Sequence, residues 1–277
     1  MSFFQNLNQN FAEKTAIRQF LTKNYHRVMK IHLKNPQEIK IMRKAGEILQ
    51  KTQAEMKKYL KEGISLLEID KIAEDFIRKE GAVPGFLGMY GFPNTICAMI
   101  NSEVVHGIPD SRKLKKGDLV SIDCGVLWKK MFADAAFSVV IGGNETNPER
   151  AKFLKCTEKA LKLGCQAAKI GNRVGDIGYI IEKTMKDAGY SVCREYTGHG
   201  LGYELHEDPH IYNYGRPGTG VVLKKGMTIA IEPIVAMGNP QVKTLKDGWT
   251  VVTVDGKDAC QCEHFGLVTK NGLEIFA

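Results

Sequence analysis

DLVSIDCGV-LWKKM-FADAAFSVV, residues 118–140, is the stretch of sequence that decides the fold. Its two outer parts are rich in β-branched and other apolar residues, whereas two of its few charges, both lysines, stand together between them. Two apolar runs separated by a short polar break predict two antiparallel strands joined by a tight turn. We therefore expect a hairpin here.

Two aspartates, Asp123 and Asp134, lie within this hairpin. With the turn centred between Trp128 and Lys129, they are expected directly opposite each other on one face of the strand pair. Opposed carboxylates repel unless one is protonated or a cation lies between them, so the pair favours a metal site. Either aspartate alone would be interpreted as an ordinary turn or edge residue.

Small residues line the same face of the hairpin. Ser121, Ala136 and Ser138 lie on the face of the aspartates, and the opposite face carries apolar side chains: Val120, Ile122, Phe137, Val139 and Ile141. One face therefore belongs to the core, and the other leaves room for a ligand.

Composition indicates a soluble globular protein. The 277 residues are 43% hydrophobic and 25% charged, and no apolar run approaches the ~20 residues of a membrane span. The start, Met1 to Asn6, lacks the basic and apolar segments of a signal peptide. Seven cysteines without a C-x-x-C pair favour reduced thiols over a structural zinc site. We expect a cytoplasmic protein with no membrane contact.

The net charge of +8 is concentrated near the amino terminus. Residues 1–44 hold nine Lys or Arg against Glu13 and Glu38, which accounts for +7 of it. We assign residues 1–34 to a basic amino-terminal extension, with a helix expected across residues 12–21. Clustered cations favour an acidic partner such as an RNA surface. Two alternatives are a solvated basic tail and an extension whose phenylalanines pack on the core.

Helix signals occur twice along the chain. Asn35-Pro36 opens a long amphipathic helix that ends near Gly63, and Ser65 begins a second one that ends at Gly81. Asn147-Pro148 opens another long helix, to about residue 171, and a further one follows over residues 176–189. At a constant offset of 108 residues the paired positions include Gly63 with Gly171, Glu68 with Asp176, and Gly81 with Gly189. An α+β domain built from two related halves, about 35–146 and 147–277, is expected.

Three further acidic or imidazole side chains lie beside small residues on separate predicted strands. They are His199 between two glycines, Glu232 after an apolar strand and before a proline, and Glu263 at the start of a strand expected to be the last. With Asp123 and Asp134 they offer four carboxylates and one imidazole. This set balances two divalent cations and suits Mn²⁺, Fe²⁺, Co²⁺ or Zn²⁺.

These motifs resemble those of the type I methionine aminopeptidases, which share the pita-bread fold of prolidases and creatinases. The resemblance runs from about Ile31 to Phe276 and rests on Ile122-Asp123, Asp134, Gly198-His199-Gly200, Ile231-Glu232-Pro233 and Glu263-His264. It implies a catalytic domain over residues 35–277. It also implies that His199 and Glu232 bind one metal ion, that Asp123 binds a second, and that Asp134 and Glu263 bridge both. Glu232 would be the general base.

The resemblance also implies residues that contact the substrate. His106, within Asn101–Pro109, and His206 would bind the substrate and stabilise the tetrahedral intermediate; each could instead be a packing histidine. The apolar pocket for a methionine side chain would be lined by Met89, Phe92, Cys97, Leu205 and Trp249. Met89, Phe92 and Leu205 depart from the aromatic residues common in the family, which leaves the shape of the pocket open.

The implied activity is removal of the initiator methionine from nascent polypeptides whose second residue is small. A monomer is expected, with ribosome association through the basic extension. One alternative is an Xaa-Pro peptidase of the same fold, although those chains carry a separate amino-terminal domain. Another is a non-catalytic ribosome- or RNA-associated relative, which would be expected to have lost metal ligands, whereas all five are present here.

Overall fold

The structure is a computed structural model that describes residues 30–277. Residues 1–29, which include the expected helix at 12–21, lie outside the described residues. Ile31–Ala277 form one compact unit, so residues 31–34, which we had assigned to the extension, fold with the domain that follows. None of the helices in the described part is long and apolar enough to cross a membrane.

Four long helices occur where the capping signals predict them. They are α2 (Pro36–Tyr59), α3 (Leu66–Lys79), α4 (Pro148–Ala167) and α5 (Val174–Asp187). The Asn35 and Ser65 side chains cap α2 and α3, and Glu38 and Glu68 return the bond to the cap backbone, completing two capping boxes. Each cap supplies acceptors for helix N–H groups that have no partner within the helix.

Local geometry recurs at the predicted offset of 108 residues. Gly63 and Gly171 end the segments before α3 and α5 with φ of 87° and 94°, and Gly81 and Gly189 follow these helices with φ of 78° and 83°. The Glu68 and Asp176 carboxylates accept from the backbone N–H groups of Ser65 and Arg173 at the starts of these helices. Matching turn and cap geometry is what an internal duplication predicts.

The central hairpin consists of β4 (Leu119–Trp128) and β5 (Met131–Val140). Trp128 pairs with Met131, so Lys129 and Lys130 form the turn, and the expected turn position was wrong. Asp123 pairs with Ala136 and Asp134 with Gly125, so the aspartates are diagonal neighbours and not directly opposed. They remain on one face because a shift of two residues preserves the alternation of side chains.

The strands of the described part form four sheets, and one of these sheets contains the hairpin. β1 (Val83–Pro84) and β2 (Ile96–Ile100) pair with β4 on the edge away from β5. The five-stranded sheet has the order β15-β14-β9-β7-β8. Its strands are β7 (Thr197–Gly200), β8 (Glu207–Tyr212), β9 (Thr228–Ile231), β14 (His264–Thr269) and β15 (Gly272–Ile275). The strand after Glu263 was expected to be the last, but β15 follows it.

Two three-stranded sheets and two short helices complete the described elements. The sheets have the orders β13-β10-β6 and β11-β12-β3. Their strands are β3 (Glu103–Val105), β6 (Ser191–Val192), β10 (Ile234–Ala236), β11 (Val242–Thr244), β12 (Val251–Thr253) and β13 (Ala259–Gln261). The 3₁₀ helices are η2 (Met89–Gly91) and η3 (Asn144–Thr146).

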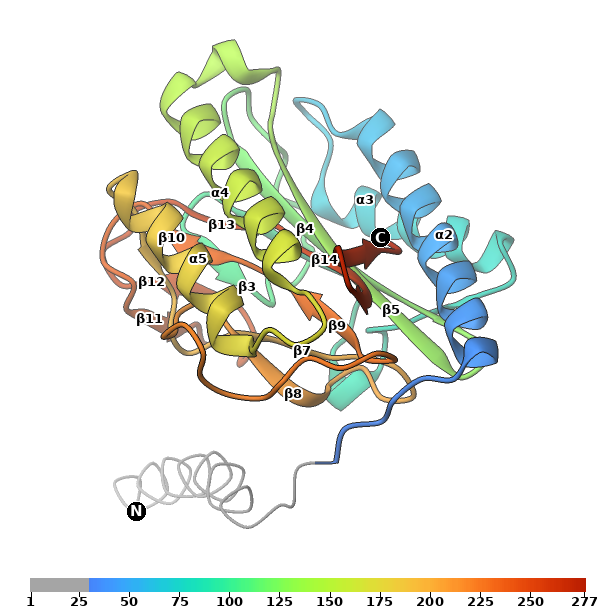
Figure 1. The fold of residues 1–277 in the computed structure, drawn as a ribbon. Helices are drawn as coiled ribbons and strands as arrows, with labels where there is room; N and C mark the ends of the chain where they lie inside the picture. Colours follow the sequence, from blue (N-terminus) through green and yellow to red (C-terminus); the bar gives the residue numbers. More distant parts are fainter. Residues whose placement is uncertain (1–29) are drawn as a thin grey trace, which may run out of the picture. The chain divides into compact units, whose positions relative to one another are not determined.

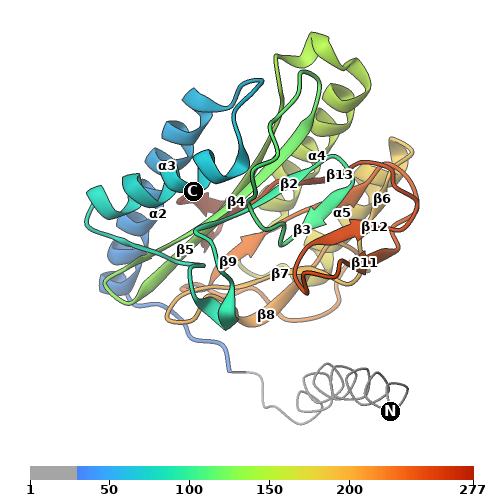
Figure 2. The ribbon, with the colours of Figure 1, turned by 180° about the vertical axis from the view of Figure 1, so that it is seen from behind.

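The helix pairs cover the outer side of the strands. In Figure 1, α2 and α3 lie to one side of the long hairpin, and α4 and α5 lie to the other. Helix α2 packs on both hairpin strands, and α4 and α5 pack on strands of the second half of the chain. Seen from behind, β11 and β12 lie in front and α4 and α5 behind (Figure 2). The opposite side of the sheets from α4 and α5 is therefore formed by strands and loops.

Each helix pair has its own hydrophobic core. Met42, Leu49 and Ile77 belong to the cluster under α2 and α3, and Phe153 and Ile181 to the cluster under α4 and α5. The strands that lie between the two clusters carry the candidate metal ligands, so rigid elements hold these ligands in place.

Candidate metal centre and active site

The five predicted ligands come from five strands or strand ends. Asp123 lies in β4, Asp134 in β5 and His199 in β7, whereas Glu232 directly follows β9 and Glu263 directly precedes β14. The Glu263 backbone N–H donates to the Ala136 carbonyl in β5, 2.8 Å away. This bond joins the connection between β13 and β14 to the hairpin. It brings the second half of the chain close to the two aspartates.

Distances show that the ligand side chains converge. One ligand atom from each of Asp134, His199 and Glu263 lies within 4.8 Å of the others. His199 Nε2 is 3.8 Å from Asp134 Oδ2 and 3.6 Å from Glu232 Oε1. Asp123 joins the same cluster through Gln261, whose Nε2 lies 3.3 Å from both Asp123 Oδ2 and Glu232 Oε2. All five predicted ligands therefore meet at one place.

The His199 ring is oriented by its backbone. His199 Nδ1 lies 2.9 Å from its neighbour's carbonyl oxygen, that of Gly200. An N–H at Nδ1 leaves Nε2 as the lone-pair donor that faces the carboxylates, which is the usual arrangement of a metal-binding histidine. Gly200 has no room for a side chain, because a Cβ there would lie 2.2 Å from the Asp208 carbonyl oxygen. Close strand packing thus explains this glycine.

The donor set fits a divalent cation. Among the described residues, Asp123 Oδ1, Asp134 Oδ1 and Glu263 Oε1 are buried without a hydrogen-bond partner. Buried carboxylate oxygens normally have partners, and three unpaired ones in a single cluster are suited to bind a cation. Oxygen-rich ligation with one imidazole suits a first-row divalent metal.

Without a cation, the cluster resists ionisation. Burial raises the pKa of Asp123 to about 6. Burial, followed by repulsion from neighbouring carboxylates, raises the pKa values of Asp134, Glu232 and Glu263 well above their usual range. Burial lowers the pKa of His199 to about 3, and repulsion from His206 adds to the effect. A bound dication would reverse this preference for neutral carboxyl groups.

Gln261, at the end of β13, is a site residue that the sequence analysis missed. Its Nε2 lies 3.3 Å from both Asp123 Oδ2 and Glu232 Oε2, so one amide donates to two candidate ligands. The small-residue face of the hairpin holds this strand. Ser138 Oγ donates to the Gln261 carbonyl over 2.7 Å, and the Gln261 backbone N–H donates to Ser121 Oγ over 3.3 Å. Part of the room expected for a ligand is thus filled by β13.

Of the two predicted substrate-binding histidines, His206 contacts a candidate ligand, and His106 lies close enough to His206 to be repelled by it. The His206 ring packs edge-on against His199 with centroids 4.5 Å apart, and His106, with φ of 58°, packs against Tyr196 at 5.7 Å. His106 is exposed, yet desolvation by the surrounding protein atoms lowers its pKa to about 4, with repulsion from His206 adding to the shift. Burial also lowers the pKa of His206.

The five predicted pocket residues belong to one apolar cluster. Phe92, Cys97 and Leu205 are buried in it, and Met89 and Trp249 pack against it. The Phe92 and Trp249 rings meet edge-on at 5.2 Å. The Cys97 backbone pairs with Asp123 across β2 and β4, which places the apolar cluster next to a candidate ligand.

Tyr90 is a second residue that the sequence analysis passed over. Its side chain is exposed and its ring stacks on His206 at 6.2 Å. Its φ of 52° is unusual for a bulky residue and is the kind of backbone strain found at functional sites. The sequence shows a tyrosine close to two glycines, but it does not show that the tyrosine itself has positive φ.

Fold and site together define a peptidase of the metal-dependent class, and comparisons with known proteins agree. Residues 40–270 match metallopeptidase family M24. Methionine aminopeptidase 1 of Bacillus subtilis is 48% identical over 87% of this chain and 97% of its own length. The crystal structure of a Thermotoga maritima methionine aminopeptidase superposes with a TM-score of 0.86, at 40% identity over 89% of this chain and 99% of that chain.

A solved prolidase from Pyrococcus horikoshii also shares the fold. Its TM-score is 0.70 at 25% identity, over 88% of this chain but 62% of the prolidase. The shared part thus spans nearly this whole chain and leaves over a third of the prolidase unmatched. The chain belongs to metallopeptidase family M24 and, within that family, stands with the methionine aminopeptidases.

Proposed function

We propose that this protein removes the amino-terminal methionine from nascent proteins and peptides whose second residue is small. The observation that carries the proposal is the convergence of Asp134, His199 and Glu263 within 4.8 Å of one another, next to the apolar cluster of Phe92, Cys97 and Leu205. A candidate metal-binding cluster beside apolar side chains suits hydrolysis of a bond that follows an apolar side chain.

Two divalent ions would occupy the cluster. His199 and Glu232 would hold one ion, Asp123 would hold the other, and Asp134 and Glu263 would contact both. Such ions supply Lewis acidity, which lowers the pKa of water and polarises a carbonyl. Four carboxylates carry the charge that balances two dications.

Glu232 would act as the general base in this arrangement. Its carboxylate is buried and shares the Gln261 amide with Asp123. In the ionised form, Glu232 can take a proton from the attacking water and pass it to the leaving amine.

His106 and His206 would bind the substrate as neutral imidazoles. Since both pKa values are lowered, each ring keeps one N–H and one lone pair at neutral pH. A neutral N–H can donate to the scissile carbonyl and to the oxyanion that develops from it. Met89, Phe92, Cys97, Leu205 and Trp249 would surround the methionine side chain.

Three tripeptides test the proposal. With added Mn²⁺, Fe²⁺, Co²⁺ or Zn²⁺, we expect hydrolysis of Met-Ala-Ser, little of Ala-Ala-Ser, and little of Met-Lys-Ser, because the apolar pocket selects the thioether and the closed site leaves little space beyond it. Equal cleavage of all three would contradict the proposal.

Two alternatives have their own tests. Cleavage of Ala-Pro-Ser would favour the Xaa-Pro peptidase, and no turnover with any metal would favour a non-catalytic relative. Metal analysis should give two ions per chain.

The basic extension is proposed to attract the enzyme to the ribosome in the cytoplasm. Lysines and arginines of residues 1–30 would bind RNA phosphate in a salt-sensitive, sequence-independent manner. Co-sedimentation with ribosomes at low salt should weaken when residues 1–30 are deleted. Unchanged binding by a folded truncated protein would disprove this role. We also expect a monomer, which sedimentation velocity would test.

A further inference from the structure

Lys34 is a buried cation at the very start of the compact unit. Its side chain is 1% exposed and forms an ion pair with Glu207, whose side chain is 10% exposed. Lysine is seldom fully buried unless it is paired. Lys34 Nζ also donates to the His32 carbonyl over 3.2 Å, and the Lys34 backbone N–H donates to the Gly226 carbonyl over 2.7 Å. These bonds fix the segment that joins the extension to α2.

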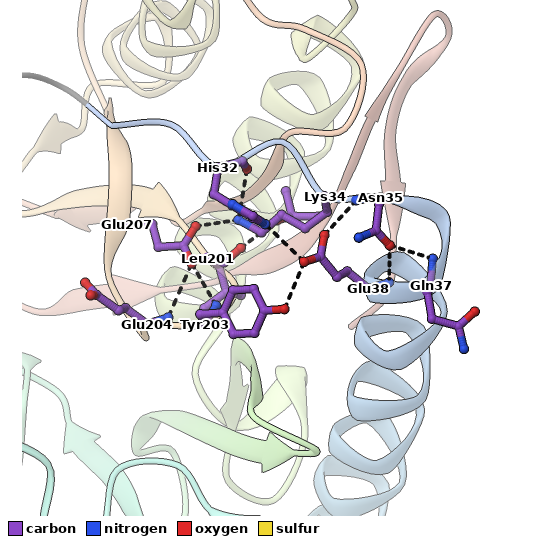
Figure 3. Close-up of polar contacts among 10 residues, drawn as sticks. His32, Lys34, Asn35, Gln37, Glu38, Leu201, Tyr203, Glu204 and Glu207 are labelled. Carbon is purple, nitrogen blue, oxygen red and sulfur yellow. Dashed lines mark hydrogen bonds and ion pairs between the residues drawn. The ribbon is translucent and has the colours of Figure 1, made fainter.

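Glu207 holds the loop that carries His206. One carboxylate oxygen, Oε2, pairs with Lys34, while Oε1 accepts from the backbone N–H groups of Tyr203 at 2.7 Å and Glu204 at 3.3 Å. Figure 3 shows the Glu207 carboxylate between Lys34 and the backbone of Tyr203 and Glu204. Glu207 directly follows His206 in the chain. The loop is tied to the start of the chain through one charged group.

A second contact joins the same two segments. Tyr203 Oη donates to Glu38 Oε1 in the first turn of α2 over 2.9 Å, and His32 Nε2 lies 3.1 Å from the same oxygen. Glu38 Oε2 meanwhile accepts from the Asn35 backbone in the capping box of the helix. We call Lys34, Glu38, Tyr203 and Glu207 the brace. Figure 3 shows the brace between α2 and the loop before β8.

The brace holds the loop together with two other anchors: the burial of Leu205, and the bond of 2.8 Å from the Phe132 backbone N–H to the Gly202 carbonyl. His206 is exposed, and its described ring contacts are the edge-on packing with His199 and the stacking with Tyr90. Gly202 lies under the Lys34 stem, since a Cβ there would come within 2.3 Å of Lys34 Cε. The loop backbone is thus packed directly against the lysine. Small displacements of a group that stabilises a transition state are costly, about 10²-fold for 1 Å.

We propose that Lys34 and Glu207 are positioning residues for the peptidase reaction, which hold the 203–206 loop so that Leu205 and His206 face the substrate. The inference rests on the proposed function for the roles of these two residues. Under this proposal, residues 31–35 help to position the active-site loop and are not merely the end of a basic extension. A structural role alone would stabilise the fold without changing the rate per folded, metal-loaded enzyme.

Three variants separate these roles. Lys34→Met leaves a buried carboxylate unpaired, Glu207→Gln keeps the shape without the charge, and Lys34→Met/Glu207→Leu replaces the pair with apolar side chains. Removing one partner of a buried pair is destabilising, whereas replacing both by apolar residues is often neutral. The double variant should therefore melt near the wild-type temperature and still lack the acceptor for the Tyr203 and Glu204 N–H groups.

We expect Lys34→Met to lower kcat on Met-Ala-Ser by about 10–100-fold, with a much smaller change in KM and unchanged metal content. The double variant should recover the melting temperature but not kcat. Backbone hydrogen exchange of residues 201–208 should be faster in all three variants. Arg43→Met is the matched control, because Arg43 in α2 also pairs across the chain, with Glu274, but on the exposed surface.

Two results would overturn the inference: wild-type kcat in Lys34→Met, or recovery of kcat together with the melting temperature in the double variant. Failure of the proposed function gives a different result, because the wild-type enzyme would then not release methionine. The exchange experiment still tests the brace in that case, since unchanged protection of residues 201–208 in Glu207→Gln would contradict it. If Lys34→Met does not fold, Glu207→Gln provides the same comparison of kcat.

Discussion

Glu232 combines two roles in the proposed reaction, as a metal ligand and as the base. Its carboxylate is 3.6 Å from the His199 ring nitrogen and accepts from Gln261. Substitution should therefore affect catalysis much more than folding.

Glu232→Gln is expected to lower kcat by at least ~10²-fold, which is the scale of general base catalysis alone. The metal-free protein should not lose stability, because one of four buried, mutually repelling carboxyl groups is removed. Enzyme assays and thermal melting of the metal-free form measure the two effects. Glu103→Gln is the control: this buried glutamate pairs with Arg112 outside the metal cluster, so it should reduce stability and retain kcat. Near-wild-type turnover by Glu232→Gln would assign the base to another group.

Individual residues differ in how well the sequence predicted them. The five candidate ligands could be identified because acidic or imidazole side chains beside glycine, serine or alanine on apolar strands are rare. The role of Gln261 could not be predicted, because a glutamine between two cysteines indicates no particular function. The role of Lys34 could not be predicted either, because a lysine within a basic extension is expected to be a solvated charge. Its burial depends on Glu207, 173 residues away in the chain.

The β4–β5 hairpin is the element that sets the distance between the two aspartates. Its turn residues, Lys129 and Lys130, have φ of 47° and 69°. Two consecutive residues with positive φ are typical of a type I′ hairpin turn, in which Asn-Gly is preferred and lysine is strained. The turn therefore contains strain that substitution can relieve.

Replacing Lys129 with Asn and Lys130 with Gly should raise the free energy of unfolding by roughly 1 kcal/mol without changing kcat. Denaturant unfolding measures the gain. Lys61→Asn, at an exposed position that is absent from the positive-φ residues, is the control and should have little effect. A loss of stability in the double variant would mean that the lysine side chains, including the Lys129 contact with Trp128, contribute more than the strain costs.

The hairpin also shows the limit of prediction at the scale of elements. Apolar alternation predicted both strands and the common face of the aspartates, but Trp128, Lys129 and Lys130 suit a turn about equally well. The expected turn was one residue from the observed one, which moved every pairing by two residues. The helices were predicted better, because Asn35 and Ser65 provide chemical signals for helix starts.

For the whole molecule, the metal cluster couples stability to pH. Burial raises the pKa of the cluster carboxyl groups above their values in the unfolded chain, so the folded state retains protons that the unfolded state releases. This contribution to stability is present at low pH and is lost as the pH rises through the folded pKa values. Histidines with lowered pKa values act in the opposite direction, but below about pH 6.5.

We therefore expect the metal-free protein to melt at progressively lower temperature from pH 6.5 to pH 8, and the metal-loaded protein to show a smaller slope. Chelation should lower the melting temperature at pH 7.5, because a ligand that binds the native state stabilises it. Calorimetry with and without chelator measures both effects. Asp134→Asn should reduce the slope of the metal-free form. Equal melting and equal activity with and without chelator would rule out the two-metal site.

The brace also predicts where proteolytic trimming becomes harmful. A cut after residue 30 leaves Lys34 with its partner, whereas a cut four residues later removes the lysine and exposes the Glu207 carboxylate to a cavity where its ammonium partner lay. We expect the product that begins at residue 31 to hydrolyse Met-Ala-Ser at the full rate and the product that begins at residue 35 to lose most of it. Purified truncated proteins assayed side by side, with metal content and melting recorded for each, would measure that difference.

Equal rates would show that the catalytic loop does not depend on the start of the compact unit. Limited digestion in a cell could thus either free the enzyme from its basic extension or inactivate it, depending on a boundary only four residues wide.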